Sequence, residues 1–497
     1  MSDKYLLGLD IGTHGSKGAI VDISGNIVAI ASCEHKLIIP QPGYAEHDAN
    51  MWWNDFVKIT KTLIRESKIE PSKIKAIGCS AIAPTMLPLD KDGIPLRNAI
   101  LYGVDSRAAV EIDELNSKIG ENLIIEKTGM PLSSQSVGPK ILWYKKNELE
   151  LFSRTKKIVT ASTYIVYKLT GKFFIDYYTA MAFLPLFDYK NKKWSTELWP
   201  DFNLDLLPEI AWSSQTVGVV SRKSASETGL MCGTKVITGT ADASAEAVSV
   251  GVVEKGDLMV MYGTSGFFIQ IANKFPQTTK LWPAIYLTEG QYALLGGMST
   301  VGALINWYKD LIGNYTYDKL NSLADRIKPG SEGIVILPYF SGARTPINNP
   351  NARGIIFGLS LYHKKEHIYR AILESIGYGI KDNVVNIEKQ GLPIKKMVAI
   401  GGGINSQILL QVVSDITKIG QKVPKTKEGA CYGDAFLAGL GIGYFKSFKD
   451  VLNWVKWEKE IIPNKNNFSI YNKLYRIYKD IYKNTYKINN RLKDISK

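Results

Sequence analysis

Two segments about half a chain apart share one pattern, and this internal repeat is the feature that most restricts the fold. The first, YLLGLDIGTHGSKGAIV, begins at Tyr5, and the second, DLMVMYGTSGFFIQI, begins at Asp257. Each consists of an apolar run, a turn with Gly-Thr and Ser, and a second apolar run, which is typical of two strands joined by a tight turn. The repeat predicts two lobes of related fold, with a cleft between them that both turns face.

Other β-branched runs alternate with helical patterns, for example in residues 73–82, 235–240 and 395–403. This alternation predicts an α/β architecture. A chain of 497 residues is also too long for one ordinary core. We therefore predict an N-terminal domain, a C-terminal domain, and a basic helical tail packed on the body, with these bounds: 1–247, 248–445 and 446–497.

The composition is that of a soluble globular protein of the cytoplasm. No apolar run approaches the roughly 20 residues of a membrane span, and we expect no membrane partner. The four cysteines are far apart and form no C-x-x-C motif, which argues against disulfides or a cysteine zinc site and favours a reducing compartment.

A net charge of +14 raises the question of a nucleic-acid partner. Much of the excess positive charge lies after residue 464, where the sequence has nine Lys or Arg residues and only two Asp residues. The same segment carries a tyrosine every three or four residues, which places the rings on one helical face. The rings could stack on bases; we favour their packing on the body with the lysines in solvent, and expect no nucleic-acid partner. The five tyrosines are Tyr471, Tyr475, Tyr478, Tyr482 and Tyr486.

The first turn has the composition of a phosphate-binding loop. Its glycines, Gly12 among them, allow a close backbone approach to an anion, and Thr13 and Ser16 add hydroxyl groups. Lys17 adds a cation, and Asp10 could hold Mg²⁺ through water. By itself the segment could equally be a plain hairpin, and no Walker A motif is present. The second Gly-Thr turn favours the phosphate interpretation, because two amide-rich turns can grip one polyphosphate.

The segment TGTADASAEAVSVG places Asp242 after a Gly-Thr turn and before a helix of small residues. A carboxylate is favourable at a helix N-terminus, so Asp242 could simply be a capping residue. The functional interpretation is a general base that accepts the proton of an attacking hydroxyl in phosphoryl transfer. A further triplet, from Gly401 through Gly402 to Gly403, follows a strand and could lie against an adenosine; it does not complete a dinucleotide-binding G-x-G-x-x-G motif.

These features resemble the FGGY carbohydrate kinases, within the actin/hexokinase/heat-shock-70 ATPase superfamily. The segment GIIFGL, seven further residues and HIYRAILE, from Gly354 to Glu374, match the second family signature in full. SVGPKILWYKKN, from Ser136, matches the first signature except at Val137 and Tyr144. QPGYAEHDANMWW and PYFSGARTPINNPNARG also look like family segments, and the second is closest to the xylulokinase form, with Ala343 where Glu is common. The resemblance covers nearly the whole chain.

The resemblance implies two RNase H-like domains around a central cleft that holds ATP, Mg²⁺ and a sugar. It implies in-line transfer of the γ-phosphate with Asp242 as the base, and a catalytic Asp10 that helps to hold the metal. It also implies a nucleotide site formed by the two turns and the glycine triplet. The residues of that site are Gly12, Thr13, Ser16, Lys17, Gly263, Thr264, Ser265, Gly302, Gly401, Gly402 and Asn405.

The sugar side departs from the xylulokinase pattern. Ala83-Pro84 stands where Met-His is usual, and AILYGVDSRA has Tyr102 in place of Trp. Asp105 and Arg107 could shape the sugar side or form an ion pair that holds a loop. We therefore expect a substrate site of Ala83, Pro84, Tyr102, Asp105, Arg107 and Asp242.

D-xylulose is the expected acceptor. Gluconate, ribulose, glycerol and other polyols are alternatives, and a non-catalytic sugar or nucleotide sensor on the same fold is the rival class. We expect no macromolecular partner beyond a second copy in a homodimer.

Overall fold

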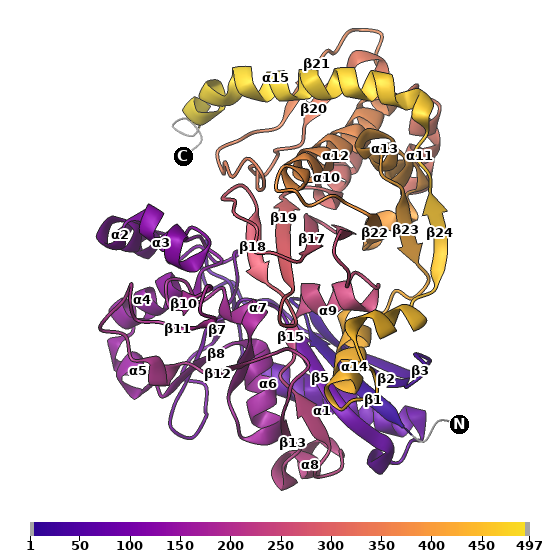
Figure 1. Ribbon diagram of the computed structural model, residues 1–497. Helices are drawn as coiled ribbons and strands as arrows, with labels where there is room; N and C mark the ends of the chain where they lie inside the picture. Colours follow the sequence, from indigo (N-terminus) through magenta and orange to yellow (C-terminus); the bar gives the residue numbers. More distant parts are fainter. Residues whose placement is uncertain (1–3, 493–497) are drawn as a thin grey trace.

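The computed structural model describes residues 4–492, which form two α/β domains with a sheet in each (Figure 1). The first domain is built on a seven-stranded mixed sheet in the order β13-β14-β5-β1-β2-β3, with β15 paired to the end of β5. Its strands are β1 (Tyr5–Ile11), β2 (Gly15–Asp22), β3 (Ile27–Glu34), β5 (Ile74–Ala81), β13 (Thr216–Val219), β14 (Lys235–Ile237) and β15 (Thr240–Ala241).

The second domain has a seven-stranded sheet in the order β18-β19-β17-β16-β22-β23-β24. Its strands are β16 (Asp257–Tyr262), β17 (Gly266–Ala272), β18 (Trp282–Ile285), β19 (Tyr292–Met298), β22 (Lys396–Ile400), β23 (Gln421–Pro424) and β24 (Trp457–Ile461). In each sheet the first strand of the repeated hairpin is antiparallel to the second and parallel to a later strand. The predicted α/β class with two related domains is confirmed.

Helices cover both sheets, and further short strands pair outside them. The helices are α1 (Ala49–Ser67), α2 (Ala109–Ile119), α3 (Glu121–Thr128), α4 (Val137–Asn147), α5 (Leu149–Arg154), α6 (Ala161–Thr170), α7 (Tyr177–Ala180), α8 (Arg222–Thr228), α9 (Asp242–Ser249), α10 (Gly302–Ile312), α11 (Tyr317–Asp325), α12 (Lys365–Glu388), α13 (Gln407–Thr417), α14 (Ala430–Gly441) and α15 (Phe468–Leu492). The short strands are β4 (Glu46–His47), β6 (Leu87–Leu89), β7 (Ala99–Ile100), β8 (Lys157–Val159), β9 (Phe174–Asp176), β10 (Phe187–Asp188), β11 (Lys193–Trp194), β12 (Glu209–Ala211), β20 (Val335–Leu337) and β21 (Ile355–Phe357). Of these, β20 and β21 lie in the second domain, and the others lie in the lobe beside the first sheet (Figure 1).

The helix α1 shows how local sequence produces these elements. Asp48 caps its N-terminus by accepting a hydrogen bond from the backbone N–H of Asn50. Trp52, Phe56 and Leu63 recur at helical spacing and are fully buried, so one face of the helix packs on the first sheet. The helix ends at Lys68, which adopts a left-handed conformation with φ 56°.

The helices α9 and α14 pack against each other between the domains (Figure 1). The helix α14 comes from the second half of the chain but lies on β1 and β5 of the first sheet. Glycines make this approach possible, because a Cβ at Gly8 would lie 1.9 Å from the carbonyl oxygen of Cys431, and one at Gly433 would lie 2.0 Å from that of Ala245. Residues from the two sheets and from both helices therefore share one hydrophobic core.

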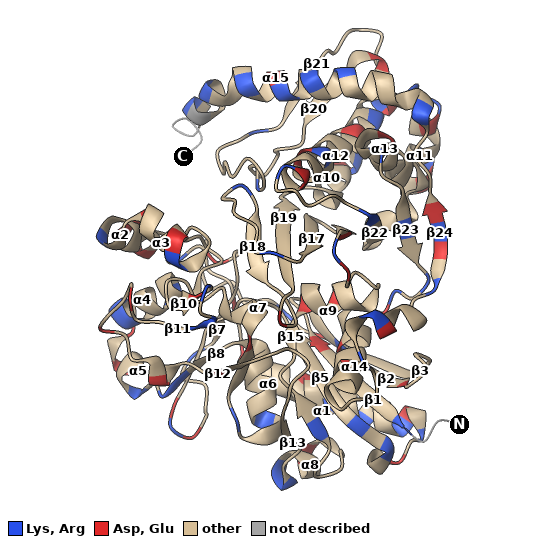
Figure 2. Ribbon diagram, in the orientation of Figure 1, with Lys and Arg blue, Asp and Glu red and all other residues tan. Residues whose placement is uncertain are grey.

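The segment predicted as a helical tail is only partly helical. Residues 457–461 form β24 at the edge of the second sheet, where they pair with β23. The helix α15 then crosses the end of the second domain, with Lys and Arg residues at intervals along it (Figure 2). Tyr471 and Tyr478 are fully buried, whereas Tyr486 is 44% exposed. The prediction that the tyrosines pack on the body is right for the first turns of the helix and wrong for Tyr486.

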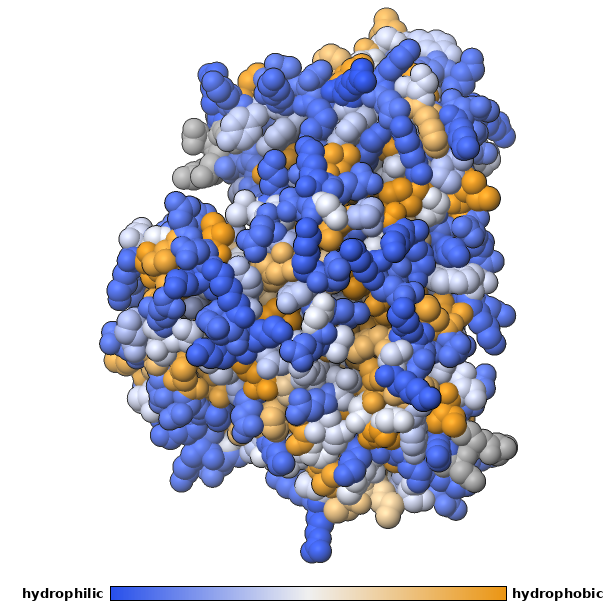
Figure 3. Space-filling view, viewed as in Figure 1, coloured by the Kyte–Doolittle hydropathy of each residue, from blue (hydrophilic) through white to orange (hydrophobic). Residues whose placement is uncertain are grey.

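Hydrophilic side chains cover most of the face shown in Figure 3, with apolar side chains in small groups between them. No helix within residues 4–492 is both long enough and apolar enough to cross a membrane.

Candidate active site

A cavity of about 420 Å³ lies between the two domains. The first domain supplies Asp10, Tyr102 and the start of α9, and the second supplies the strands β17 and β18. Six residues predicted from the sequence line this cavity: Asp10, Ala83, Pro84, Tyr102, Asp242 and Ser265.

A group of carboxylates occupies one part of the cavity. Asp10 lies near the end of β1, and Asp242 is the first residue of α9, where Glu246 follows one turn later on the same face. Burial and the neighbouring charge of Asp242 raise the pKa of Asp10, and the same causes raise the pKa of Glu246 to about 7. Glu246 is therefore poised to change protonation near neutral pH, and Asp10 holds a proton more readily than an exposed aspartate.

Ser80 connects Asp10 to a fourth carboxylate on α14. The Ser80 hydroxyl lies 2.9 Å from Oδ1 of Asp10 and 2.6 Å from Oδ2 of Asp434. A hydroxyl has one proton to donate, so both contacts are satisfied when one of the two carboxylates is protonated and donates to Ser80. Burial raises the pKa of Asp434 well above its usual range, which agrees with this arrangement.

Asp242 has the environment of a general base. Burial raises its pKa to about 6, while the backbone N–H of Ala243, 2.7 Å from Oδ1, partly opposes the shift. A carboxylate of that pKa is ionised at neutral pH and is more basic than an exposed aspartate. The position at a helix N-terminus, expected from the sequence, is confirmed, and the same side chain faces the cavity.

We expect the pH dependence of catalysis to report this group. Protonation of Asp242 removes the base, so kcat/KM for the sugar should fall as pH decreases through about 6. Initial rates between pH 4.5 and 8.5 test this, with enzyme returned to pH 8 after each exposure to exclude denaturation. A flat profile down to pH 4.5 would contradict the assignment.

The first turn contributes only some of the predicted contacts. Gly12 N–H donates to the carbonyl oxygen of Gly15 at 2.8 Å and closes the turn, and the Thr13 hydroxyl lies 3.1 Å from the hydroxyl of Tyr102. Lys17 forms an ion pair with Glu428 just before α14. Ser16 is buried and donates to Asp55 at 2.8 Å, so its predicted role as a phosphate contact is wrong: its strand turns the hydroxyl toward α1.

A backbone hydrogen bond joins the second turn, which contains Gly263, to the start of α10. Its Thr264 and Ser265 are exposed, and the carbonyl oxygen of Gly263 accepts a hydrogen bond from the N–H of Gly302 at 2.9 Å. A Cβ at Gly302 would lie 2.8 Å from that same oxygen. The predicted residues Gly263 and Gly302 therefore lie together, and Gly302 supports the turn.

The glycine triplet lies beside this turn. Gly401 follows β22 with φ 83°, and a Cβ there would lie 2.8 Å from the carbonyl oxygen of Tyr262, the last residue of β16. Gly402 is exposed, with no atom within 4 Å of a Cβ placed on it, and Asn405 is also exposed. Because β16 and β22 are parallel neighbours, the predicted adenosine motif and the second turn occur at one edge of the sheet.

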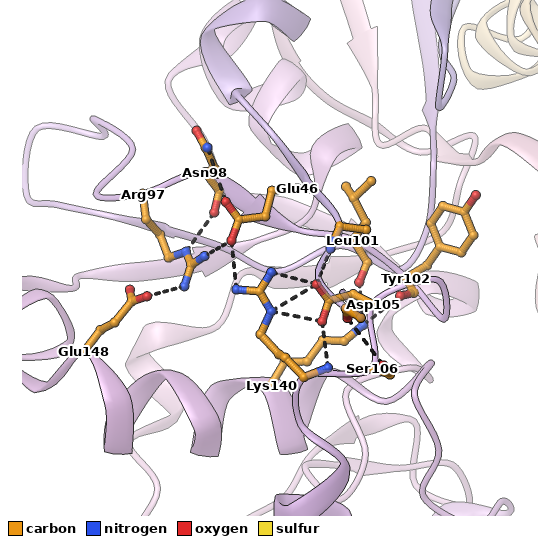
Figure 4. Close-up of polar contacts among 12 residues, drawn as sticks. Glu46, Arg97, Asn98, Leu101, Tyr102, Asp105, Ser106, Lys140 and Glu148 are labelled. Carbon is orange, nitrogen blue, oxygen red and sulfur yellow. Dashed lines mark hydrogen bonds and ion pairs between the residues drawn. The ribbon is translucent and has the colours of Figure 1, made fainter. Parts of the chain in front are cut away.

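Asp105 and Arg107 do not line the cavity, so their predicted contact with the sugar is wrong. Both side chains are buried, and Arg107 pairs with Asp105 at 2.7 Å and with Glu46 at 2.8 Å (Figure 4). Asp105 also accepts a hydrogen bond from the N–H of Ala45 at 2.7 Å. These charges satisfy one another, and they hold the loop that carries Tyr102.

Lys140 supports the same loop from α4. Its side chain is buried, and the ammonium donates to the carbonyl oxygens of Leu101 at 2.5 Å and Tyr102 at 3.1 Å (Figure 4). Burial is the main cause that lowers the pKa of Lys140 to about 7, with Arg107 adding to the effect. Lys140 is a positioning residue, because it acts on the cavity through Tyr102.

We expect Lys140→Met to raise the KM for the sugar by about tenfold while the KM for ATP stays unchanged, since both charge-assisted hydrogen bonds to the loop of Tyr102 are lost. Steady-state kinetics with either substrate varied measures the difference. Lys145→Met is the matched control, because Lys145 lies on the same helix and is exposed. An equal change in both KM values would show that the loop does not act on the sugar alone.

Several residues at or beside the site were not predicted, among them Glu246, Ser80, Asp434, Trp282 and Arg344. The Asp242-to-Glu246 spacing of four in a helix would have signalled Glu246. Ser80 and Asp434 meet across 354 residues of chain, and Trp282 and Arg344 approach the cavity from separate segments. Ser80, Asp434 and Trp282 carry no local pattern, whereas Arg344 lies in the family-like segment PYFSGARTPINNPNARG noted above.

The fold and the site together define a phosphotransferase with an actin-like ATPase fold, in which Asp10, Asp242 and Ser265 of the second turn line a cavity between the domains. Models of the N- and C-terminal domains of the FGGY family of carbohydrate kinases match residues 5–249 and 258–442. The chain belongs to the FGGY family of carbohydrate kinases, and it is an ATP-dependent sugar kinase.

The relatives include kinases for more than one acceptor. The chain is 31% identical to the xylulose kinase of Lactococcus lactis subsp. lactis, over 98% of both chains. The structure of xylulose kinase from Rhodospirillum rubrum superposes with a TM-score of 0.93 and 26% identity, covering 98% of this chain and 100% of the other. Gluconate kinase from Lactobacillus acidophilus superposes with a TM-score of 0.91 and 27% identity, covering 97% and 98%.

Proposed function

We propose that this kinase transfers the γ-phosphate of ATP to a terminal hydroxyl of D-xylulose, with Asp242 as the general base. The observation that carries the proposal is the position of Asp242, an ionisable group with a pKa of about 6 that lines a cavity of about 420 Å³ between the domains. The similarity to xylulose kinases supports the choice of acceptor.

In the proposed reaction, Asp242 accepts the proton of the sugar hydroxyl as its oxygen attacks the γ-phosphorus. The bond from that phosphorus to the bridging oxygen breaks, and ADP leaves. Backbone N–H groups of the two Gly-Thr turns stabilise the charge on the phosphoryl oxygens. The glycine triplet, with Gly401, Gly402 and Asn405, supports the adenosine.

The residues at the cleft fit a hard divalent cation. Asp10, Asp242 and Glu246 offer carboxylate oxygens in one cavity. Within residues 4–492, no group of three or more His, Cys, Asp or Glu side chains is arranged to hold a metal by itself. Mg²⁺ usually keeps several waters and binds one or two carboxylates together with substrate phosphates, so Asp10 is the residue proposed to hold it, through water. Mg²⁺ would neutralise charge on the ATP phosphates.

The proposed setting is the cytoplasm. Within the described chain, Cys33, Cys79, Cys232 and Cys431 are free thiols, and ATP is the cosubstrate. Assembly into a homodimer stays a prediction.

The test is ADP release with Mg-ATP and a panel of D-xylulose, D-ribulose, L-ribulose, gluconate, glycerol and erythritol. We expect the highest kcat/KM with D-xylulose, and loss of activity with EDTA that added Mg²⁺ restores. Turnover of gluconate or glycerol instead would overturn the choice of acceptor. If no acceptor in the panel causes ADP release, although the protein still binds ATP, a non-catalytic sugar or nucleotide sensor would be favoured.

A further inference from the structure

Arg344 differs from Arg97 and Arg107, the arginines of the ion-pair network around Glu46, because it has no charged partner in the part of the chain that the structure describes. Arg97 pairs with Glu46 and Glu148, and Arg107 pairs with Asp105 and Glu46. For Arg344, in contrast, no hydrogen bond or ion pair to another side chain occurs within residues 4–492, although its side chain is partly buried and lines the cavity.

The environment of Arg344 holds the guanidinium in place without neutralising it. Its guanidinium carbon lies 4.8 Å from the ring centroid of Trp282, a cation–π contact. A Cβ at Gly297 would lie 3.2 Å from one guanidinium nitrogen, so the group packs against the backbone of β19. The adjacent Thr345 fixes the loop, since its hydroxyl accepts from the N–H of Gly297 at 2.7 Å and contacts Asn383 at 2.7 Å.

Charged side chains of both signs line the cavity. Its carboxylates are Asp10, Asp242 and Glu246, and Arg344 is the single Lys, Arg or His among the described residues that line it. Burial lowers the pKa of Arg344, and Tyr102, not a carboxylate, is the neighbour that opposes the shift. Within residues 4–492, none of these carboxylates forms an ion pair with Arg344. The guanidinium therefore stays available to a ligand that also reaches Asp242.

A guanidinium donates hydrogen bonds and accepts none. A ligand that places a hydroxyl at Asp242 and extends toward Arg344 must bring an oxygen acceptor to the far end. Carbonyl and carboxylate oxygens suit this group best, because they accept without needing to donate.

We propose that Arg344 is a specificity-determining residue that binds a carbonyl-type oxygen, of a ketone or a carboxylate, at the end of the acceptor opposite the phosphorylated hydroxyl. This inference rests on the proposed function and narrows it. It selects keto sugars or sugar acids over polyols of the same length, and it gives Arg344 no part in binding ATP.

The experiment compares matched acceptors that differ only at the far end. D-xylulose is paired with xylitol, which lacks the ketone, and D-gluconate is paired with D-glucitol, which lacks the carboxylate. Dissociation constants are measured by calorimetry without ATP, so the result does not depend on turnover. Wild type, Arg344→Met, Arg344→Lys and the control Lys280→Met are compared; Lys280 is an exposed cation shortly before β18.

We expect Arg344→Met to weaken binding of the carbonyl-type acceptor by about 10- to 100-fold, the value of a hydrogen bond to a charged group, and to change polyol binding by less than about twofold. Arg344→Lys should restore part of the loss, and Lys280→Met should have no effect. An unchanged melting temperature and ATP affinity show that Arg344→Met is folded.

Three outcomes would overturn the inference: equal weakening of both members of a pair, no weakening at all, or a loss of ATP affinity in place of sugar affinity. The two acceptor pairs also separate this inference from the proposed function. If gluconate binds wild type at least tenfold more tightly than D-xylulose, and Arg344→Met weakens that binding, the role of Arg344 is supported and D-xylulose is not the acceptor. If D-xylulose binds more tightly than gluconate, and Arg344→Met weakens that binding, the role of Arg344 and the choice of D-xylulose are both supported.

Discussion

Asp242→Asn should lower kcat by about 10²- to 10⁴-fold, the usual contribution of a general base. Asparagine keeps the shape of aspartate and an oxygen that accepts the N–H of Ala243, so binding of sugar and ATP should change little. Steady-state rates of ADP release and calorimetric dissociation constants measure the two effects separately.

Asp113→Asn is the control for that substitution, because Asp113 is an exposed aspartate on α2. It should behave as wild type. Activity of Asp242→Asn within tenfold of wild type would remove Asp242 from the role of base and leave it as a helix-capping residue.

The same substitution should stabilise the protein without ligands at pH 8. Burial raises the pKa of Asp242 in the folded state from 3.8 to about 6, so the folded protein holds this proton more tightly than the unfolded chain. Stability from this group is full below about pH 4 and is lost as pH rises through 6. Removing the charge should recover on the order of 2 kcal/mol at pH 8. A melting temperature that rises at pH 8, and rises less at pH 4.5, would confirm this.

The second large effect is expected in the packing between the domains. Gly8→Ala places a Cβ 1.9 Å from the carbonyl oxygen of Cys431 and 2.5 Å from the backbone nitrogen of Ala435. Both atoms belong to the backbone of α14, so no side chain can rotate to make room. We expect a loss of at least about 3 kcal/mol, at the upper end of overpacking effects, measured as a lower melting temperature or a failure to fold.

Gly402→Ala is the matched control for stability, because no atom lies within 4 Å of a Cβ at Gly402. Its melting temperature should equal that of wild type, whatever its effect on nucleotide binding. Equal melting temperatures for Gly8→Ala and wild type would show that α14 shifts at little cost.

The sequence identified the parts of the site that short segments encode. The repeated Gly-Thr turns predicted two related domains, because strand periodicity and turn residues act locally. Asp242 was recognisable because a strand, a turn and a helix start follow one another within a few residues. Ala83, Pro84 and Tyr102, which the family resemblance assigned to the sugar side, line the cavity, and their contact with the sugar stays a prediction.

The tertiary structure decided which hydrogen-bond or ion-pair partner each polar side chain has. Ser16 looked like a phosphate contact, but it donates to Asp55 on α1; Asp105 and Arg107 looked like sugar contacts, but they neutralise one another in a buried network. The reverse holds for Asp434, which carries no local motif, and for Arg344, whose family-like segment PYFSGARTPINNPNARG did not identify it as a site residue. Packing of α14 on the first sheet brings Asp434 to Ser80, and the fixed loop beside β19 brings Arg344 to the cavity without a counter-charge. By itself the sequence determined the fold and the family and made Asp242 the candidate base, because turns and periodicity are local. Only the three-dimensional packing decided which charges are paired and which remain available to a ligand, because pairing depends on contacts between distant segments.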